Sequence, residues 1–320
     1  MSLAILLANV DWDRPFFKKL ARNDTGEAPG HQGGMVIPKD LRKFFPGLLG
    51  ITSALQPTLD QRITAELFVE DTFLGLANTR YQYQTWGGER SPESRLTDEL
   101  GPLRNRAKGG DYLLIQRSID NLSYYRLILV RQVSKDYGAI SGLTGTRNWG
   151  PLTGELPLSD PELRAAETAE RARENAPFQL FDLTSVKVEI TSMRTARSVA
   201  FRQTIQRVYQ ETCCVCGSAL KSPAGLLELD AAHVVPRGKA GADDARNGLA
   251  LCKRHHWAFD RGLFGIDTKR KVYVPARVQG MPQNKPVADL HGSSIQEASE
   301  ILLRANDAAL DWHFNNVLVR

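Results

Sequence analysis

Four side chains that commonly bind metal ions lie in two closely spaced pairs in the last third of the chain. Cys213 and Cys216 are separated by two residues, and Cys252 and His255 repeat that spacing. Two such pairs supply the four sulfur and nitrogen ligands of a closed tetrahedral zinc site. This clustering is typical of a metal site rather than of a disulfide framework. The fourth cysteine, Cys214, is too close to Cys216 to act as a ligand, and we expect it to pack in the interior.

Three further polar residues follow one another between and after these pairs, in the order His233, Asn247 and His256. Hydrolysis of a phosphodiester needs a base that activates water and a divalent cation that neutralises the charge growing on the phosphoryl and leaving oxygens. A hairpin strand carrying His233 can face a helix carrying His256 across a gap the size of one metal ion. Asn247, in the intervening loop, can fix the hairpin and orient the first histidine. On a helix, His255 and His256 would point about 100° apart, so one can serve zinc and the other a catalytic metal.

The stretches AAHVVPRG, DDARNGLALC and RHHWAFDRGLFGID that frame these residues resemble the HNH nuclease family, in its zinc-stapled branch. The resemblance covers about residues 200–267, and WHFNNVL around Trp312 is similar to the tail of such proteins. It implies a ββα-metal finger built from a β-hairpin and a helix. It also implies that His233 is the general base, His256 a ligand of a catalytic Mg²⁺ or Mn²⁺, and Asn247 a positioning residue, while zinc is structural only.

The chain departs from the family pattern at one position. Many members place an aspartate directly before the first histidine as the second metal ligand, whereas Ala232 stands there in this sequence. Asp230 lies three residues before His233, and Asp260 follows His256 by four residues, one helical turn along the same face. Either carboxylate could complete the metal shell. Asp230 could equally cap a turn, and Asp260 could simply end the helix.

The amino-terminal stretch LARNDTGEAPGHQGGMVIPKDLRKFFPG, 20–47, resembles the effector-binding domain of the EcoRII restriction endonuclease, a DNA-binding pseudobarrel. A second stretch, TWGGERSPESRLT at 85–97, resembles the Arg/Glu/Arg recognition segment of that domain, with one residue inserted. The matching elements of the first stretch are Asn23-Asp24-Thr25-Gly26, Gly30-His31-Gln32, Ile37-Pro38 and Phe45-Pro46.

This second resemblance implies that two arms contact DNA in the major groove. One arm supplies His31, and the other supplies Arg90, Glu93 and Arg95. Arginine can pair with guanine through two hydrogen bonds, and glutamate accepts from the cytosine amino group. The alternative is that GERSPESR forms a solvated turn with an internal salt bridge. The insertion leaves the assignment between Glu93 and Ser94 open.

Hydrophobic patterning predicts the elements that position these residues. Apolar runs at 35–38, 63–69, 111–118 and 124–133 predict strands, and 42–49 predicts one or two helical turns. Segments 158–178, 194–213 and 297–318 predict helices, the last with Ile301, Leu302 and Leu310 on its apolar side. Together with the two resemblances, these elements imply an α+β chain: a mainly β DNA-recognition pseudobarrel at 1–155, a helical linker at 156–185 and a zinc-containing HNH nuclease domain at 186–320.

Composition sets the remaining limits. The 320 residues are 42% hydrophobic and 24% charged, which is ordinary for a soluble globular protein. No run approaches the roughly 20 apolar residues of a membrane span, and the opening residues lack a secretory pattern, so we expect a cytoplasmic protein. A net charge of +5 suits a polyanionic partner such as double-stranded DNA.

These features together predict a site-specific endonuclease of restriction type. Because one metal finger cuts one strand, a double-strand break predicts a homodimer, and a cognate DNA methyltransferase could act separately. One alternative is a modification-dependent endonuclease with an aromatic pocket, for which Tyr81, Tyr83 and Trp86 are candidates. Another is a non-catalytic DNA-binding regulator that keeps a zinc scaffold, an idea that Ala232 favours.

Overall fold

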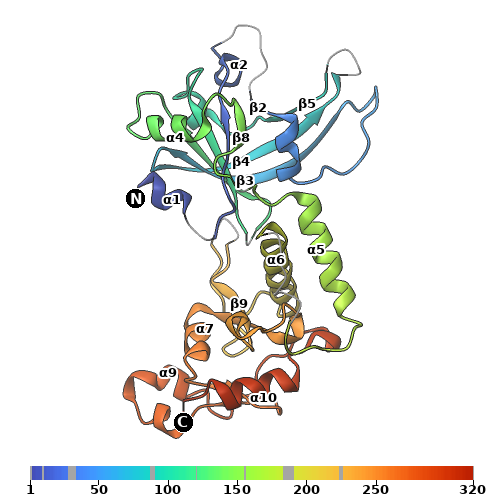
Figure 1. Cartoon of the computed structure of the whole chain (residues 1–320), viewed down its shortest axis with the longest axis vertical. Helices are drawn as coiled ribbons and strands as arrows, with labels where there is room; N and C mark the ends of the chain where they lie inside the picture. Colours follow the sequence, from blue (N-terminus) through green and yellow to red (C-terminus); the bar gives the residue numbers. More distant parts are fainter. Residues whose placement is uncertain are drawn as a thin grey trace. The chain divides into compact units, whose positions relative to one another are not determined.

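The computed structural model describes residues 2–8, 11–27, 34–86, 91–119, 121–154, 156–182, 191–222 and 226–319. The chain divides into two compact units, Met1–Pro161 and Glu162–Arg320. A large curled sheet dominates the first unit, and helices surround a small hairpin in the second (Figure 1). The prediction of an α+β fold with a mainly β amino-terminal part is confirmed. In the parts of the chain just given, no helix is both long enough and apolar enough to cross a membrane.

The first unit is built on one sheet of eight strands in the order β2-β5-β4-β3-β7-β6-β1-β8. Strands β3 and β7 run parallel, and the other neighbours are antiparallel. The sheet curls into a half-barrel, and the long β3–β4 hairpin lies in the middle of its strand order (Figure 1). The elements are α1 (Leu3–Leu7), β1 (Phe16–Lys19), α2 (Arg22–Thr25), β2 (Met35–Ile37), η1 (Lys39–Phe44), β3 (Thr58–Val69), β4 (Thr72–Gln84), β5 (Glu93–Leu96), α3 (Gly101–Arg104), β6 (Tyr112–Arg117), β7 (Tyr124–Val130), α4 (Tyr137–Thr144) and β8 (Trp149–Pro151).

Both faces of the central strands are covered. Every residue of β6 and β7 is buried, which explains why their sequences read as continuous apolar runs rather than as alternating ones. One core contains Phe16 and Leu127, and a second core on the opposite face contains Phe17 and Ile128. The adjacent residues Phe16 and Phe17 therefore anchor two separate cores from one strand.

The second unit places a short hairpin and a helix beside the long helix α6. Strands β9 and β10 pair antiparallel with His233 opposite Gly248 and Leu229 opposite Cys252, and α7 begins directly after β10 (Figure 1). The elements are α5 (Asp160–Arg173, which starts at the end of the first unit), α6 (Thr191–Val208), β9 (Leu229–His233), η4 (Arg237–Lys239), η5 (Ala245–Asn247), β10 (Gly248–Cys252), α7 (Lys253–Asp260), β11 (Gly265–Ile266), β12 (Val272–Tyr273), α8 (Ala276–Gln279), η6 (Pro282–Asn284), α9 (Lys285–Ala288), η7 (Ile301–Leu303) and α10 (Asp307–Asn316).

Two predicted helices are shorter than expected. Helix α6 ends at Val208, because Gln210 and Glu211 adopt positive φ angles of 54° and 57° and turn the chain before the cysteines. The prediction of one helix over 297–318 is wrong.

In its place, η7 is separated from α10 by Arg304, whose backbone is extended. Asn306 caps the new helix by accepting a hydrogen bond from the Ala308 amide. Ile301 and Leu302 are consequently exposed, while Leu310 is buried as expected.

Candidate active site and metal centre

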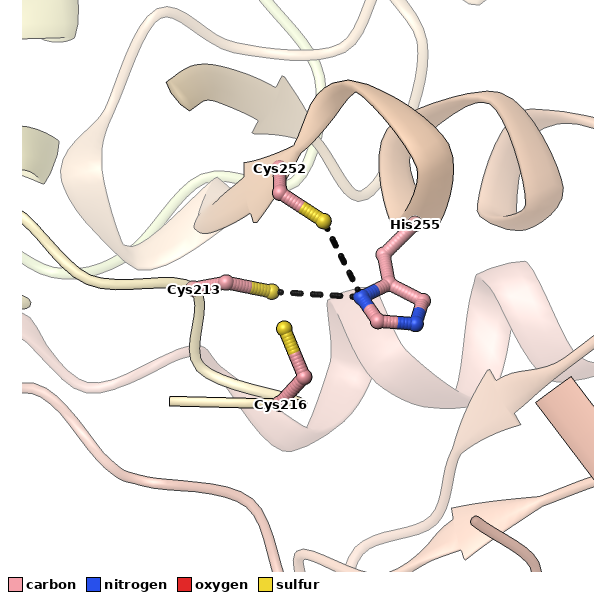
Figure 2. Close-up of side chains that lie close together, drawn as sticks. All are labelled: Cys213, Cys216, Cys252 and His255. Carbon is pink, nitrogen blue, oxygen red and sulfur yellow. Dashed lines mark hydrogen bonds between the residues drawn. The ribbon is translucent and has the colours of Figure 1, made fainter. Parts of the chain in front are cut away.

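The two predicted ligand pairs converge on one point. One ligand atom from each of Cys213, Cys216, Cys252 and His255 lies within 4.8 Å of the others. Nδ1 of His255 is 3.5 Å from Sγ of Cys213 and 3.2 Å from Sγ of Cys252. Figure 2 shows the three sulfur atoms and this nitrogen pointing toward a common centre. For tetrahedral zinc, bonds of roughly 2.3 Å to sulfur and 2.1 Å to nitrogen give sulfur–nitrogen distances of about 3.6 Å, so the cluster fits zinc closely.

The chemistry of these donors also fits a bound cation. Burial and the neighbouring sulfurs raise the pKa of Cys252 to about 12, so the thiolate of this residue is disfavoured without a positive charge beside it. A metal ion removes that penalty because it coordinates the thiolate directly. Burial lowers the pKa of His255, which keeps the imidazole neutral as a ligand must be. Cys214 lies outside the cluster and packs in the core of the unit.

The hairpin between the two pairs is closed by Asn247, whose side chain is 0% exposed. Its Oδ1 accepts a hydrogen bond from the Val235 amide at 2.8 Å. Its Nδ2 donates to the carbonyls of Val235 at 3.1 Å and Ala242 at 2.9 Å. The side-chain amide of Asn247 therefore uses both of its N–H groups and one of its two oxygen lone pairs. These hydrogen bonds hold the segment that follows β9 against the segment that precedes β10.

His233 ends β9 and is fixed on two sides. Its ring stacks on Phe201 of α6 with centroids 4.1 Å apart and 17° between the planes. Its Nε2 lies 2.9 Å from Oδ1 of Asp243, a carboxylate that is 6% exposed. Arg237 pairs with the other oxygen of Asp243 at 3.0 Å. Asp243 was not among the residues predicted from the sequence, in which the acidic pair at 243–244 directly before ARN is its one signal.

His256 lies on α7 between both candidate carboxylates. Its Nδ1 is 2.8 Å from Asp230 of β9, and its Nε2 is 3.4 Å from Asp260. The side chain of Asp230 is 16% exposed and that of Asp260 is 51% exposed. Lys253 also pairs with Asp230 at 2.6 Å. Burial alone would raise the pKa of Asp230, but hydrogen bonds from His256 and Lys253 outweigh it and lower this pKa to about 2.

The two carboxylates do not form a three-ligand group with His256, since each faces a different ring nitrogen. Among the described residues, only the cysteine and histidine set brings three or more ligand atoms together. Ala232 is fully buried in the core and has no ligand atom. The carboxylates next to His256 are those of Asp230 and Asp260.

The predicted DNA-reading residues are only partly described. His31 and Arg90 lie outside the described residues. Glu93 and Arg95 are on β5, where the guanidinium Nε donates to the glutamate Oε1. The alternative interpretation of GERSPESR also expected an internal salt bridge, but in a solvated turn, whereas Glu93 and Arg95 lie on a strand.

The remaining histidines and the aromatic candidates serve packing in part. His291 accepts a hydrogen bond from the Val274 amide, and His313 stacks on Phe259 with centroids 3.7 Å apart. Tyr81 is buried and stacks on Phe45, so it belongs to the core of the first unit. Tyr83 lies beneath the guanidinium of Arg42.

Comparison with known families identifies the segment that contains the hairpin and the ligand pairs. Residues 213–267 match the HNH endonuclease family. The HNH domain therefore covers the cysteine and histidine cluster, both strands β9 and β10, and helix α7. No curated protein matches the sequence.

Three solved structures show likenesses to the chain. The modification-dependent TagI restriction endonuclease is 19% identical, with a TM-score of 0.30, over 38% of this chain and 39% of that chain. The N-terminal domain of Helicobacter pylori LlaJI.R1 is 15% identical, with a TM-score of 0.29, over 44% of this chain and 99% of that chain. The Type IV phosphorothioation-dependent restriction endonuclease ScoMcrA is 15% identical, with a TM-score of 0.26, over 80% of this chain and 47% of that chain. TM-scores this low carry no argument about fold or activity.

Proposed function

We propose that this protein is a metal-dependent endonuclease of restriction type that cuts double-stranded DNA. The observation that carries the proposal is the HNH endonuclease match over 213–267, in a segment whose hairpin is closed by Asn247 and whose helix carries His256. The cysteine and histidine cluster is assigned to structural zinc, because all four protein ligands leave no position open for substrate.

In the proposed reaction, His233 is the general base. It accepts a proton from a water molecule, whose oxygen forms a bond to phosphorus while the bond to the bridging oxygen breaks. The leaving oxygen takes a proton from solvent. Stacking on Phe201 and the contact with Asp243 hold the imidazole in one orientation, as a base that acts on a positioned water must be held.

His256 and one carboxylate are assigned to the catalytic divalent cation, Mg²⁺ or Mn²⁺, which supplies charge neutralisation at the phosphate when bound. We favour Asp230 over Asp260, because Asp230 is the more buried of the two and lies nearer to the His256 ring, at 2.8 Å against 3.4 Å. If Asp230 held the cation, Lys253 would be free to pair with a backbone phosphate of the DNA instead.

The first unit is assigned to DNA recognition, with His31, Arg90, Glu93 and Arg95 as the residues that contact bases. Since one HNH domain cuts one strand, we expect two copies of the chain on a palindromic or near-palindromic site. A separate methyltransferase would then protect the host sites.

Parallel digestion of unmodified, methylated and phosphorothioate-containing plasmid with Mg²⁺ or Mn²⁺ tests the proposal. Cutting of unmodified plasmid is the expected result, and cutting restricted to a modified plasmid would instead favour a modification-dependent enzyme. Tight specific binding without cutting of any plasmid in either metal would contradict the nuclease and favour a DNA-binding regulator.

A further inference from the structure

Helix α5 contacts the loop that precedes β10 at several points, although the sequence predicted it to be a connecting helix. Arg173 donates a hydrogen bond to the carbonyl of Asp243, and Glu170 accepts one from the Ala245 amide at 3.0 Å. In the opposite direction, Arg246 donates to the carbonyls of Arg173 and Ala176, each at 2.9 Å. The carboxyl end of α5 is thereby joined to residues 243–246 by hydrogen bonds from both partners.

The same loop controls the ring of His233. A carboxylate can only accept hydrogen bonds, so the contact with Asp243 requires a proton on Nε2 of His233 and leaves the lone pair on Nδ1. That tautomer is the one in which the imidazole can act as a base through Nδ1. The ion pair from Arg237 to the second oxygen of Asp243 fixes the rotation of the carboxylate itself.

Glu170 is the least expected member of this arrangement. Glu170 is 5% exposed, although the residues near it on the solvent side of α5 are charged or small. Burial raises the pKa of Glu170 to about 7, an effect that Arg173 opposes and that Asp244 and Asp243 add to. Buried polar groups are normally hydrogen-bonded, and the carboxyl group of Glu170 meets this condition by accepting a hydrogen bond from the Ala245 amide.

From these contacts we infer that Asp243 and Glu170 are positioning residues of the nuclease reaction. Asp243 sets the tautomer and orientation of His233, and Glu170 holds the loop that carries Asp243, so α5 is a brace of the active site and not a spacer. The inference rests on the proposed function, in which His233 is the base. Because α5 starts at Asp160, the brace is continuous in sequence with the first unit, which ends at Pro161.

Four variants of the full chain test the inference: Asp243→Asn, Glu170→Ala, Glu170→Gln and the control Glu167→Ala, which truncates a glutamate one turn earlier on α5. Glutamine keeps the oxygen that accepts from Ala245 and loses only the 3.4 Å ion pair with Arg173, so Glu170→Gln should behave much more like the wild type than Glu170→Ala does. Hydrogen exchange should show the Ala245 amide exposed on the order of 10-fold more often in Glu170→Ala but not in Glu170→Gln or Glu167→Ala. Nitrogen-15 NMR should show His233 protonated on Nε2 in the wild type, and a mixture of tautomers in Asp243→Asn.

Cleavage of supercoiled plasmid under single-turnover conditions gives the functional readout. We expect Asp243→Asn to lower the rate at saturating DNA on the order of 100-fold without changing the affinity for DNA. Glu170→Ala should lower the rate on the order of 10-fold, with Glu170→Gln and Glu167→Ala close to the wild type. A merely structural role of Glu170 would alter the rate, the affinity for DNA and the melting temperature together in Glu170→Ala, whereas a positioning role lowers the rate alone.

The outcomes separate the two levels of the proposal. If His233→Ala cuts like the wild type, the proposed function fails. If His233→Ala is inactive while Asp243→Asn and Glu170→Ala cut at the wild-type rate, the positioning inference alone is overturned. Equal loss in Glu170→Ala and Glu170→Gln, or in Glu167→Ala, also overturns it. The exchange and NMR measurements need no DNA, so they decide the inference whichever DNA the enzyme cuts: an unchanged Ala245 amide in Glu170→Ala contradicts it.

Discussion

Asn247 provides the most exacting test of how the hairpin is held. Replacing it with alanine removes the partner of three buried backbone groups: the Val235 amide, the Val235 carbonyl and the Ala242 carbonyl. An orphaned buried polar group costs about 1 to 3 kcal/mol, and water entering the vacated space would satisfy some of them. We therefore expect Asn247→Ala to lower the free energy of unfolding of the second unit by about 3 to 5 kcal/mol.

Asn247→Asp tests the loss of hydrogen bonds without a loss of side-chain volume. Aspartate has nearly the same shape and can still accept from the Val235 amide, but it cannot donate to the two carbonyls that Asn247 contacts. In a fully buried place its charge would also face carbonyl oxygens. This variant should consequently be at least as unstable as Asn247→Ala.

Differential scanning calorimetry at fixed zinc concentration measures the effect. For a unit of this size, 1 kcal/mol corresponds to roughly 2 to 4 °C, so the transition of the second unit should fall by at least about 6 °C in both variants. Hydrogen exchange should locate the loss of protection at Val235. A melting temperature within about 1 °C of the wild type for Asn247→Asp would refute the reasoning, because the two donated bonds would then contribute nothing.

Three further predictions concern the same unit. Cys216→Ser should lose bound zinc and melt at a lower temperature, which zinc analysis and thermal unfolding can check. A chelator should lower the melting temperature of the wild type but have no further effect on this variant. A Cβ at position 241 would lie 1.8 Å from the Val235 oxygen, whereas a Cβ at position 238 would meet nothing within 4 Å. Gly241→Ala should therefore destabilise the fold and Gly238→Ala should not. Equal melting temperatures of the two variants would contradict this. Burial lowers the pKa of His313 from 6.5 to about 4, so the folded protein takes up this proton less readily than the unfolded chain. The free energy of unfolding should therefore fall by up to about 3 kcal/mol as pH falls from about 6.5 to about 4. In urea titrations, His313→Gln should flatten that part of the pH profile.

Short-range chemistry made much of the second unit predictable. The cysteine and histidine pairs have ligand spacing within single turns, and the resemblance of the stretches around them to HNH nucleases implied the hairpin and the helix. The same holds for β6 and β7, which read as strands because both their faces are buried. The spacing within each ligand pair and the apolar run of each strand depend on residues only a few positions apart in the sequence.

The residues that orient His233 could not be predicted, because their contacts depend on the path of a loop. Asp243 contacts the histidine from a loop whose two ends, at Val235 and Ala242, are joined by hydrogen bonds from Asn247. Glu170 meets Ala245 from 75 residues away, and an exposed, charged helix gave no sign of a buried carboxyl group. The break before α10 was missed for a related reason: the apolar residues fit a helix, and the cap at Asn306 decides otherwise.

Cleavage by His233→Ala tests the central claim most directly. The imidazole is partly exposed and stacks on Phe201, so the variant should remain folded, with an unchanged melting transition of the first unit and unchanged affinity for DNA. With plasmid that the wild type cuts in Mg²⁺ or Mn²⁺, we predict that cutting by the variant falls at least about 100-fold. Cutting at the wild-type rate, with the same metal requirement, would contradict the assignment of His233 as the base.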